Sequence, residues 1–182
     1  KKISDIEYFE LLLDSLIYGK NEDNKNKLES IIELKEEVDE YICIKKNNSK
    51  SNRKKEHYSN IKEVISPSGL KIQIGGNNRQ NELISLRKRK KGDLWFHAQE
   101  SPGSHVVLKS SNGLVDEKDI QLAADIASLF SRAKGNKLVP ILMVPIENLQ
   151  RISGALPGTV RHRGGEVLWG RAERAEKYFQ HK

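Results

Sequence analysis

Alternating apolar and polar positions predict a first β-hairpin in the middle of the chain. Residues 63–65 and 70–74 are rich in Val, Ile and Leu, and the Ser-Pro-Ser-Gly sequence at 66–69 between them is typical of a turn. Apolar residues before this point recur with a helical period instead. We therefore expect the part of the chain that contains β-strands to begin near Ile61.

A second hairpin is predicted at residues 94–109. Apolar residues at 94, 96 and 98 alternate with Trp95, His97 and Gln99, so the strand has two different faces. The Pro-Gly pair at 102–103 then turns the chain into a second strand. Five consecutive basic residues stand just before the first strand. The hairpin thus combines a basic edge with a polar and aromatic face, which suits contact with an anionic polymer.

Helical spacing predicts an α-helical hairpin in residues 1–44. A Ser-Asp-Ile-Glu capping box at 4–7 precedes one periodic apolar stretch, and a second stretch runs from 25 to 42. Gly, Asn and Asp between them favour an antiparallel pair. The pair is either the base of a coiled-coil arm or a cover for one side of the next domain. Residues 45–59, rich in Asn, Ser and Lys, are predicted to form a flexible basic linker.

Residues 60–182 are predicted to form one mixed domain. We expect Asn77 or Asn78 to cap a helix that ends at Lys90, and Asp116 to cap a helix that ends at Lys134. A strand is expected at 138–145, followed by a hairpin at 159–171 whose turn is Gly-Gly. This order of elements predicts an α+β fold, with a mostly antiparallel sheet and helices on one side.

Charge is distributed unevenly along the chain, whose net charge is +7. Residues 1–43 carry 6 basic and 12 acidic side chains, a balance of −6, whereas residues 44–182 carry 26 and 13, a balance of +13. A basic domain of this kind is typical of binding to nucleic acid or to an anionic membrane surface. We favour nucleic acid, and no apolar run is long enough for a membrane span.

The single cysteine bears on the cellular location of the protein, and the first residue bears on whether the chain is a segment of a larger one. Cys43 is the only cysteine, which excludes an intrachain disulfide and favours a cytoplasmic location. The chain begins with Lys rather than Met, and we interpret it as a segment of a larger protein.

Most candidate RNA-binding residues are basic. Five consecutive cations exceed what the dipole of a helix end requires, so phosphate contact is favoured over a merely solvated helix end. Two lysines after the second predicted helix extend the set, and two arginines share one face of a later strand. These candidates are Arg87, Lys88, Arg89, Lys90, Lys91, Lys134, Lys137, Arg161 and Arg163.

The second hairpin adds aromatic and histidine candidates. Trp95 is either a core residue or a stacking platform for an unpaired base, and His97 and His105 either hold the hairpin or contact RNA. Together with Asp93 the histidines form a weak metal-binding pattern, which leaves a metal-dependent nucleic-acid hydrolase as a minor alternative. No nucleophile or carboxylate pair accompanies them. We therefore expect no catalytic residue, metal, cofactor or small-molecule substrate.

Asn77 and Arg79 are candidates for a phosphate contact. They follow two glycines at 75–76, and such a sequence lets backbone amides approach an anion at the start of a helix. A plain turn with a helix cap explains these residues equally well. The segment lacks the Gly-Lys-Ser/Thr of a P-loop, so no nucleotide cofactor is expected.

Several motifs in the same order resemble the NFACT-R domain, the RNA-binding module of the NFACT family. They are the D-x-W-x-H spacing at 93–97 with Pro-Gly-Ser-His-Val at 102–106, the Gly-Gly-Asn segment at 75–82, Val139-Pro140, and Ser-Gly-x-x-Pro-Gly at 153–158. The resemblance extends from about Ile61 to Arg171, and the combination of motifs makes it specific.

The resemblance implies a function. NFACT proteins act in ribosome-associated quality control, where they bind large ribosomal subunits that are blocked by peptidyl-tRNA, and bacterial members support alanine tailing of the nascent chain. By this likeness the chain is the C-terminal part of such a factor, and its helical hairpin at 1–44 is the base of the family's coiled-coil arm. It contacts large-subunit ribosomal RNA or tRNA without catalysing peptide transfer. The family's N-terminal domain has no counterpart here, so tailing is not expected of this chain alone. Because bacterial relatives have been labelled fibronectin-binding, adhesion is the main alternative.

Overall fold

The computed structural model describes Lys35 and residues 61–110 and 113–179. The predicted helical hairpin at 1–44 and the linker at 45–59 lie outside these residues, apart from Lys35, which is helical and exposed. Residues from Ile61 onward belong to one compact unit, and the fold described below is that of this unit. Among the described residues, no helix has the length and apolar character needed to cross a bilayer.

Six strands form one antiparallel sheet in the order β1-β2-β4-β3-β5-β8. The strands are β1 (Lys62–Ile65), β2 (Lys71–Ile74), β3 (Leu94–Ala98), β4 (Val106–Leu108), β5 (Val139–Pro145) and β8 (Glu166–Gly170). Both predicted hairpins are confirmed, since β1 pairs with β2 and β3 pairs with β4. The predicted α+β class and the antiparallel sheet are confirmed as well.

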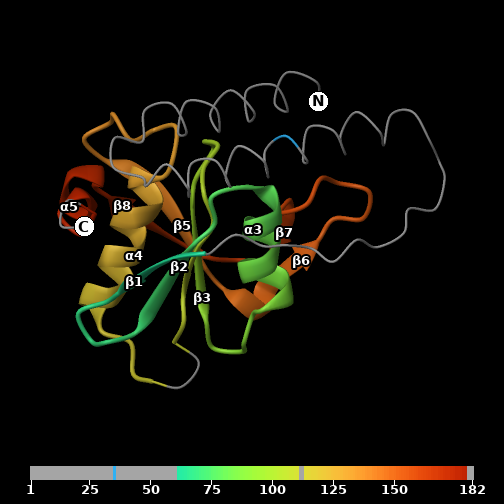
Figure 1. Ribbon diagram of the computed structural model, residues 1–182, viewed down its shortest axis with the longest axis horizontal. Coiled ribbons are helices and arrows are strands. Elements are labelled where there is room, and N and C mark those ends of the chain that lie inside the picture. The colour runs from blue at the N-terminus through green and yellow to red at the C-terminus, as the bar shows by residue number, and fades with distance from the viewer. Residues whose placement is uncertain (1–34, 36–60, 111–112, 180–182) are drawn as a thin grey trace. The chain divides into compact units, whose positions relative to one another are not determined.

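The helices α4 (Glu117–Leu129) and α5 (Ala172–Glu176) pack against one face of this sheet (Figure 1). Asp116 caps α4 in a capping box with Asp119, as the sequence predicted for the cap. The helix ends at Leu129, five residues before the predicted end. The Phe130 carbonyl accepts a hydrogen bond from the Ser104 N–H at 2.9 Å, so the chain turns there to meet the β3–β4 loop.

The opposite face is covered by three elements and not, as predicted, left without helices. They are α3 (Asn78–Glu82), the π-helical turn η1 (Leu83–Arg87) and a small sheet made of β6 (Leu149–Arg151) and β7 (Val160–His162). Ile84, Trp95 and Val144 are buried together on this side. Because β3 and β5 carry apolar residues on both faces, both faces need a cover. Figure 1 shows α3, β6 and β7 across the strands from α4 and α5.

The predicted Gly-Gly hairpin at 159–171 is wrong. β7 pairs with β6 and β8 pairs with β5, so Gly164 and Gly165 carry the chain from one sheet to the other. Both glycines have positive φ, +68° and +124°. A Cβ on Gly165 would lie 2.9 Å from atoms of Leu142, Met143 and Val144, so this glycine is required by its contact with β5.

Replacement of Gly165 by Ala is therefore expected to destabilise the domain by about 3 kcal/mol, the sum of backbone strain and overpacking. Gly164→Ala is the matched control, because a Cβ there meets no atom within 4 Å and only the positive φ is costly. We expect the control to cost about 1 kcal/mol. Urea unfolding of both variants measures the difference, and equal losses would show that contact with β5 does not limit this position.

Candidate nucleic-acid interface

The basic run Arg87–Lys91 lies at the end of the sheet where β3 begins. η1 ends at Arg87 with a π-type hydrogen bond from the Lys88 N–H to the Leu83 carbonyl, 2.8 Å long. The chain then forms a loop into β3, so the predicted helix ends three residues before Lys90. All five basic residues are exposed, as phosphate contact requires.

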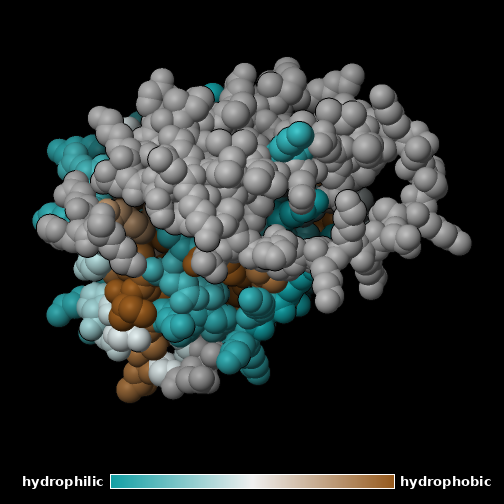
Figure 2. Space-filling model, in the orientation of Figure 1, coloured by the Kyte–Doolittle hydropathy of each residue, from teal (hydrophilic) through white to brown (hydrophobic). Residues whose placement is uncertain are grey.

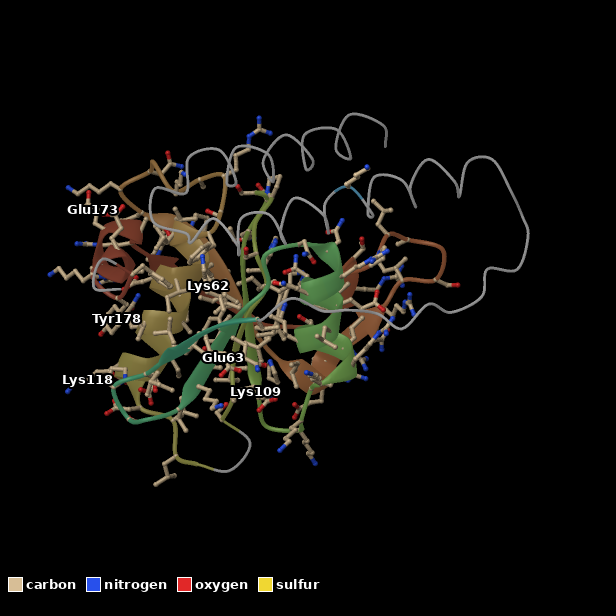
Figure 3. All side chains as sticks on the ribbon, viewed as in Figure 1. Lys62, Glu63, Lys109, Lys118, Glu173 and Tyr178 are labelled. Atoms are coloured by element: carbon tan, nitrogen blue, oxygen red, sulfur yellow. The ribbon has the colours of Figure 1, made fainter. Side chains whose placement is uncertain are left out.

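Asp93 holds this loop in place. Its side chain is fully buried, accepts a hydrogen bond from the Lys90 N–H at 3.0 Å and forms an ion pair with Lys109. The Lys109 ammonium also donates to the Lys88 carbonyl at 3.2 Å. Figure 3 shows Lys109 beside the loop that precedes β3. Asp93 therefore organises the backbone of the basic run.

The small β6–β7 sheet brings further arginines to the same end of the fold. Arg89 donates from Nη1 to the Leu149 carbonyl at 2.8 Å, and the Arg163 N–H donates to the Asn148 carbonyl at 3.1 Å. Arg161 alternates with the partly buried Val160, which packs against the core, so Arg161 points away from it. Arg161 therefore lies in the small sheet that Arg89 contacts, and Arg163 follows it directly in the chain.

Arg151 belongs to the same surface, although sequence reasoning did not identify it. The buried carboxylate of Glu82 lies 3.2 Å from an Arg87 Nη2 and 3.5 Å from an Arg151 Nη2. No motif marks Arg151, because only this shared ion pair brings it to Arg87. We call the assembled set the basic surface: Arg87, Lys88, Arg89, Lys90, Lys91, Arg151, Arg161 and Arg163.

Lys134 and Lys137 do not extend the basic surface. Ser131 forms a β-bridge with Gly103, and the Arg132 N–H donates to the Pro102 carbonyl at 2.9 Å. The segment after α4 therefore lies beside the loop that follows β3, whereas the basic run precedes β3. Five strand residues at about 3.3 Å each separate the two ends.

Asn77 caps α3, as one of the two predicted alternatives stated. Its side chain accepts from the Gln80 N–H, and the Gln80 side chain accepts from the Gly76 N–H, each at 2.8 Å. These amides have protein partners, which favours the turn-and-cap interpretation over a phosphate contact. Arg79 follows within the first turn and is half-buried.

Trp95 is a core residue. Its side chain is 3% exposed and packs with Ile84, Val107 and Val144. The indole ring stacks on His97 at 5.5 Å between centroids, and His105 meets it edge-on at 5.0 Å. A buried ring offers no free face to a base, so burial favours the core alternative for Trp95 over the stacking platform.

The two histidines support the β3–β4 hairpin. His105 is buried, and its Nδ1 lies 2.8 Å from the Ser85 hydroxyl, while its backbone N–H donates to the Asn81 side chain at 3.0 Å. His97 is half-buried, with Nε2 at 3.3 Å from the Gly103 carbonyl. His105 is therefore too buried to contact RNA directly, whereas part of the His97 side chain is exposed.

Burial lowers the pKa of His97 and holds the pKa of His105 well below its usual value of 6.5. Below about pH 6.5 the unfolded chain therefore binds protons that the folded chain does not, and stability is lost as the pH falls. We expect a slope that approaches about 1.4 kcal/mol per pH unit for His105 alone. Urea unfolding between about pH 5 and 7 measures it. His105→Gln should flatten the curve, and an unchanged slope would refute this origin.

Asp93, His97 and His105 do not converge on one point. Lys109 forms an ion pair with the Asp93 carboxylate, and the Ser85 hydroxyl is hydrogen-bonded to a ring nitrogen of His105. Within the described residues, no group of three potential metal ligands is close enough to share an ion. The hydrolase alternative therefore finds no support in the geometry of these three residues.

A family model described as the NFACT protein RNA binding domain matches residues 58–164, more than half of the chain. The chain belongs to the NFACT family. This confirms the resemblance seen in the motifs around the β3–β4 hairpin. It also places the basic run, Arg151 and the whole β6–β7 sheet within the matched NFACT domain.

Relatives of this NFACT chain carry the name Rqc2 homolog RqcH. The chain is 36% identical to the Bacillus subtilis protein over 159 residues, which cover 87% of this chain and 26% of the relative. Identity to the Streptococcus suis protein is 40% over 97 residues, or 53% of this chain and 17% of the relative. The chain thus spans about a quarter or less of the length of these relatives.

A solved structure has the same fold. It is the C-terminal part of the fibronectin/fibrinogen-binding protein from Streptococcus suis, with a TM-score of 0.71 and 29% identity. The match covers 96% of this chain and 68% of that one.

Proposed function

We propose that this chain is the RNA-binding module of a ribosome-associated quality control factor. The observation that carries the proposal is the basic surface, which two separate segments of an NFACT RNA-binding domain assemble at one end of the sheet. Its relatives' name, Rqc2 homolog RqcH, supports the same assignment.

The proposed partners are large-subunit ribosomal RNA and tRNA, in a cytoplasmic factor that binds stalled subunits carrying peptidyl-tRNA. The exposed cations of the basic surface would contact phosphates, while Asp93 and Glu82 keep the loop and two arginines in position. The module contributes binding and orientation, and alanine tailing belongs to the larger protein. We propose no catalytic residue, cofactor or small-molecule substrate for this chain.

Lys134 and Lys137 lie beside a different end of the fold, together with the start of α3 that carries Asn77 and Arg79. The Gly75 N–H donates to the His105 carbonyl at 3.0 Å, which ties that start to the residues preceding β4. Lys134, Lys137 and Arg79 are proposed as secondary contacts that a long RNA reaches in addition to the basic surface, whereas Asn77 keeps its role as a helix cap.

A salt titration tests the proposal. The chain is mixed at equal concentrations with large-subunit ribosomal RNA, tRNA, heparin as a generic polyanion, and fibronectin, which the name of the structurally similar Streptococcus suis protein suggests. Binding to either RNA that exceeds binding to heparin, and that weakens steeply with salt, is the expected result. Firm fibronectin binding without preference for RNA would refute the proposal and favour adhesion.

A further inference from the structure

One exposed tryptophan lies on the same face of the sheet as the basic surface. Trp169 is 57% exposed on the edge strand β8, and Val167 on the same strand is 48% exposed. Leu168 between them packs on the opposite face, against the core beneath α4. Since side chains alternate along a strand, Trp169 and Val167 share the face that η1 and the β6–β7 sheet cover elsewhere.

The register of the sheet gives Trp169 apolar and aromatic neighbours on this face. Pro140 stands opposite Trp169, and Leu142 stands between Val167 on one side and His97 on the other. Pro140, Leu142 and His97 are all half-buried. A strip of apolar and aromatic residues therefore crosses β3, β5 and β8 from His97 to Trp169, and the ring of Trp169 is its most exposed part.

An arginine flanks this strip. Arg171 follows Trp169 by two residues in extended conformation, with φ −127° and ψ 113°, so its exposed side chain lies on the same face. An aromatic ring beside an arginine favours an anionic partner that also has planar rings.

The backbone of β8 argues against a peptide strand as the partner at this edge. The Trp169 carbonyl accepts a hydrogen bond from the Gln121 side chain at 3.0 Å, and the Arg171 N–H donates to Asp125 at 2.8 Å. An added peptide strand must form hydrogen bonds with the backbone N–H and C=O groups of the edge strand. Side chains of α4 already form hydrogen bonds with two of these backbone groups. Recognition at this point therefore involves the side-chain face of β8.

We propose that Trp169 is a stacking platform for an unpaired RNA base. The proposal rests on the proposed RNA-binding function and adds a preference for single-stranded over fully paired RNA. Six residues separate Trp169 from Arg163 of the basic surface, a reach of at most about 22 Å along the chain. One strand of RNA thus places its phosphates on the basic surface and a splayed base on Trp169, where Arg171 contacts the adjoining phosphate.

The test compares Trp169→Ala and Trp169→Phe with Tyr178→Ala, a control that removes an exposed aromatic ring from the segment after α5 (Figure 3). Each full chain is titrated with a single-stranded oligouridylate and with a blunt RNA duplex. We expect Trp169→Ala to bind the single strand about tenfold more weakly with an unchanged salt slope, and Trp169→Phe to restore most of the affinity. Duplex binding and the Tyr178→Ala control should match the wild type.

Fluorescence of the unaltered protein provides a readout that does not depend on a variant. The chain has 2 tryptophans, of which Trp95 is buried, so quenching by single-stranded RNA reports on Trp169. Normal RNA affinity of Trp169→Ala, or absence of quenching, would overturn the stacking role while leaving the basic surface and the proposed function intact. An altered association state of Trp169→Ala with normal RNA affinity would assign the strip to a protein partner. Absence of any RNA binding by the wild type would overturn both proposals.

Discussion

Charge reversal of Lys90 and Lys91 is expected to weaken RNA binding by about 100-fold near physiological salt and to lower the slope of log affinity against log salt by about 2. Both side chains are exposed in the loop that Asp93 holds, and each phosphate contact releases counterions when it forms. Loss of two contacts therefore reduces the affinity and its salt dependence together. Filter binding of tRNA over a series of salt concentrations measures both quantities.

Reversal of Lys118 and Lys177 is the matched control. The two lysines are exposed on α4 and immediately after α5, across the sheet from the basic surface, and their reversal changes the net charge by the same amount. Figure 3 shows Lys118 at the start of α4, away from Lys109 and the loop that precedes β3. Equal loss of affinity in the two double variants would mean that total charge, rather than the basic surface, attracts the RNA.

Truncation of Trp95 to Ala is expected to destabilise the domain by about 3–5 kcal/mol, the usual cost of removing a buried aromatic side chain. The indole stacks between the hairpin and η1, where its loss leaves a cavity lined by Ile84, Val107 and Val144. Urea unfolding followed by circular dichroism measures the change. Trp169→Ala, which removes the same ring from an exposed position, should alter stability by no more than about 0.5 kcal/mol.

One result for Trp95→Ala would contradict the core role of this residue. A Trp95→Ala protein with normal stability and weakened RNA binding would show that the ring is accessible in solution and contacts RNA directly. Comparison of Trp95→Ala with Trp169→Ala thus distinguishes a tryptophan that stabilises the core from one that acts at the surface.

The described surface in Figure 2 carries both hydrophilic and hydrophobic residues. Hydrophilic residues dominate the described part of this view, with hydrophobic residues gathered in separate patches. Cations such as those of the basic surface tolerate exposure at little cost, whereas an exposed tryptophan forgoes the free energy of burial. An exposed tryptophan beside a cation therefore indicates a binding role, whereas an exposed lysine needs no such explanation.

Part of the candidate site followed directly from sequence. The basic run, its position just before β3 and its exposure are local consequences of five adjacent cations that cannot be buried without partners. Arg151 could not be found in this way, because its relation to Arg87 exists only through the buried Glu82 carboxylate. Lys134 and Lys137 were grouped with the run, although β3 places them at the other end of the sheet.

By itself, the sequence determined the features that neighbouring residues control. The turn at 66–69, the Asp116 capping box, the Asn77 cap and the alternation in β3 all arise from interactions across a few residues. Tertiary structure decided which face of an alternating strand is covered and which partner a strand takes. Trp95 and Trp169 both occupy alternating strands, yet η1 and the β6–β7 sheet cover only Trp95, and β7 pairs with β6 rather than with β8. Coverage and pairing depend on segments far apart in the chain, so period and propensity cannot specify them.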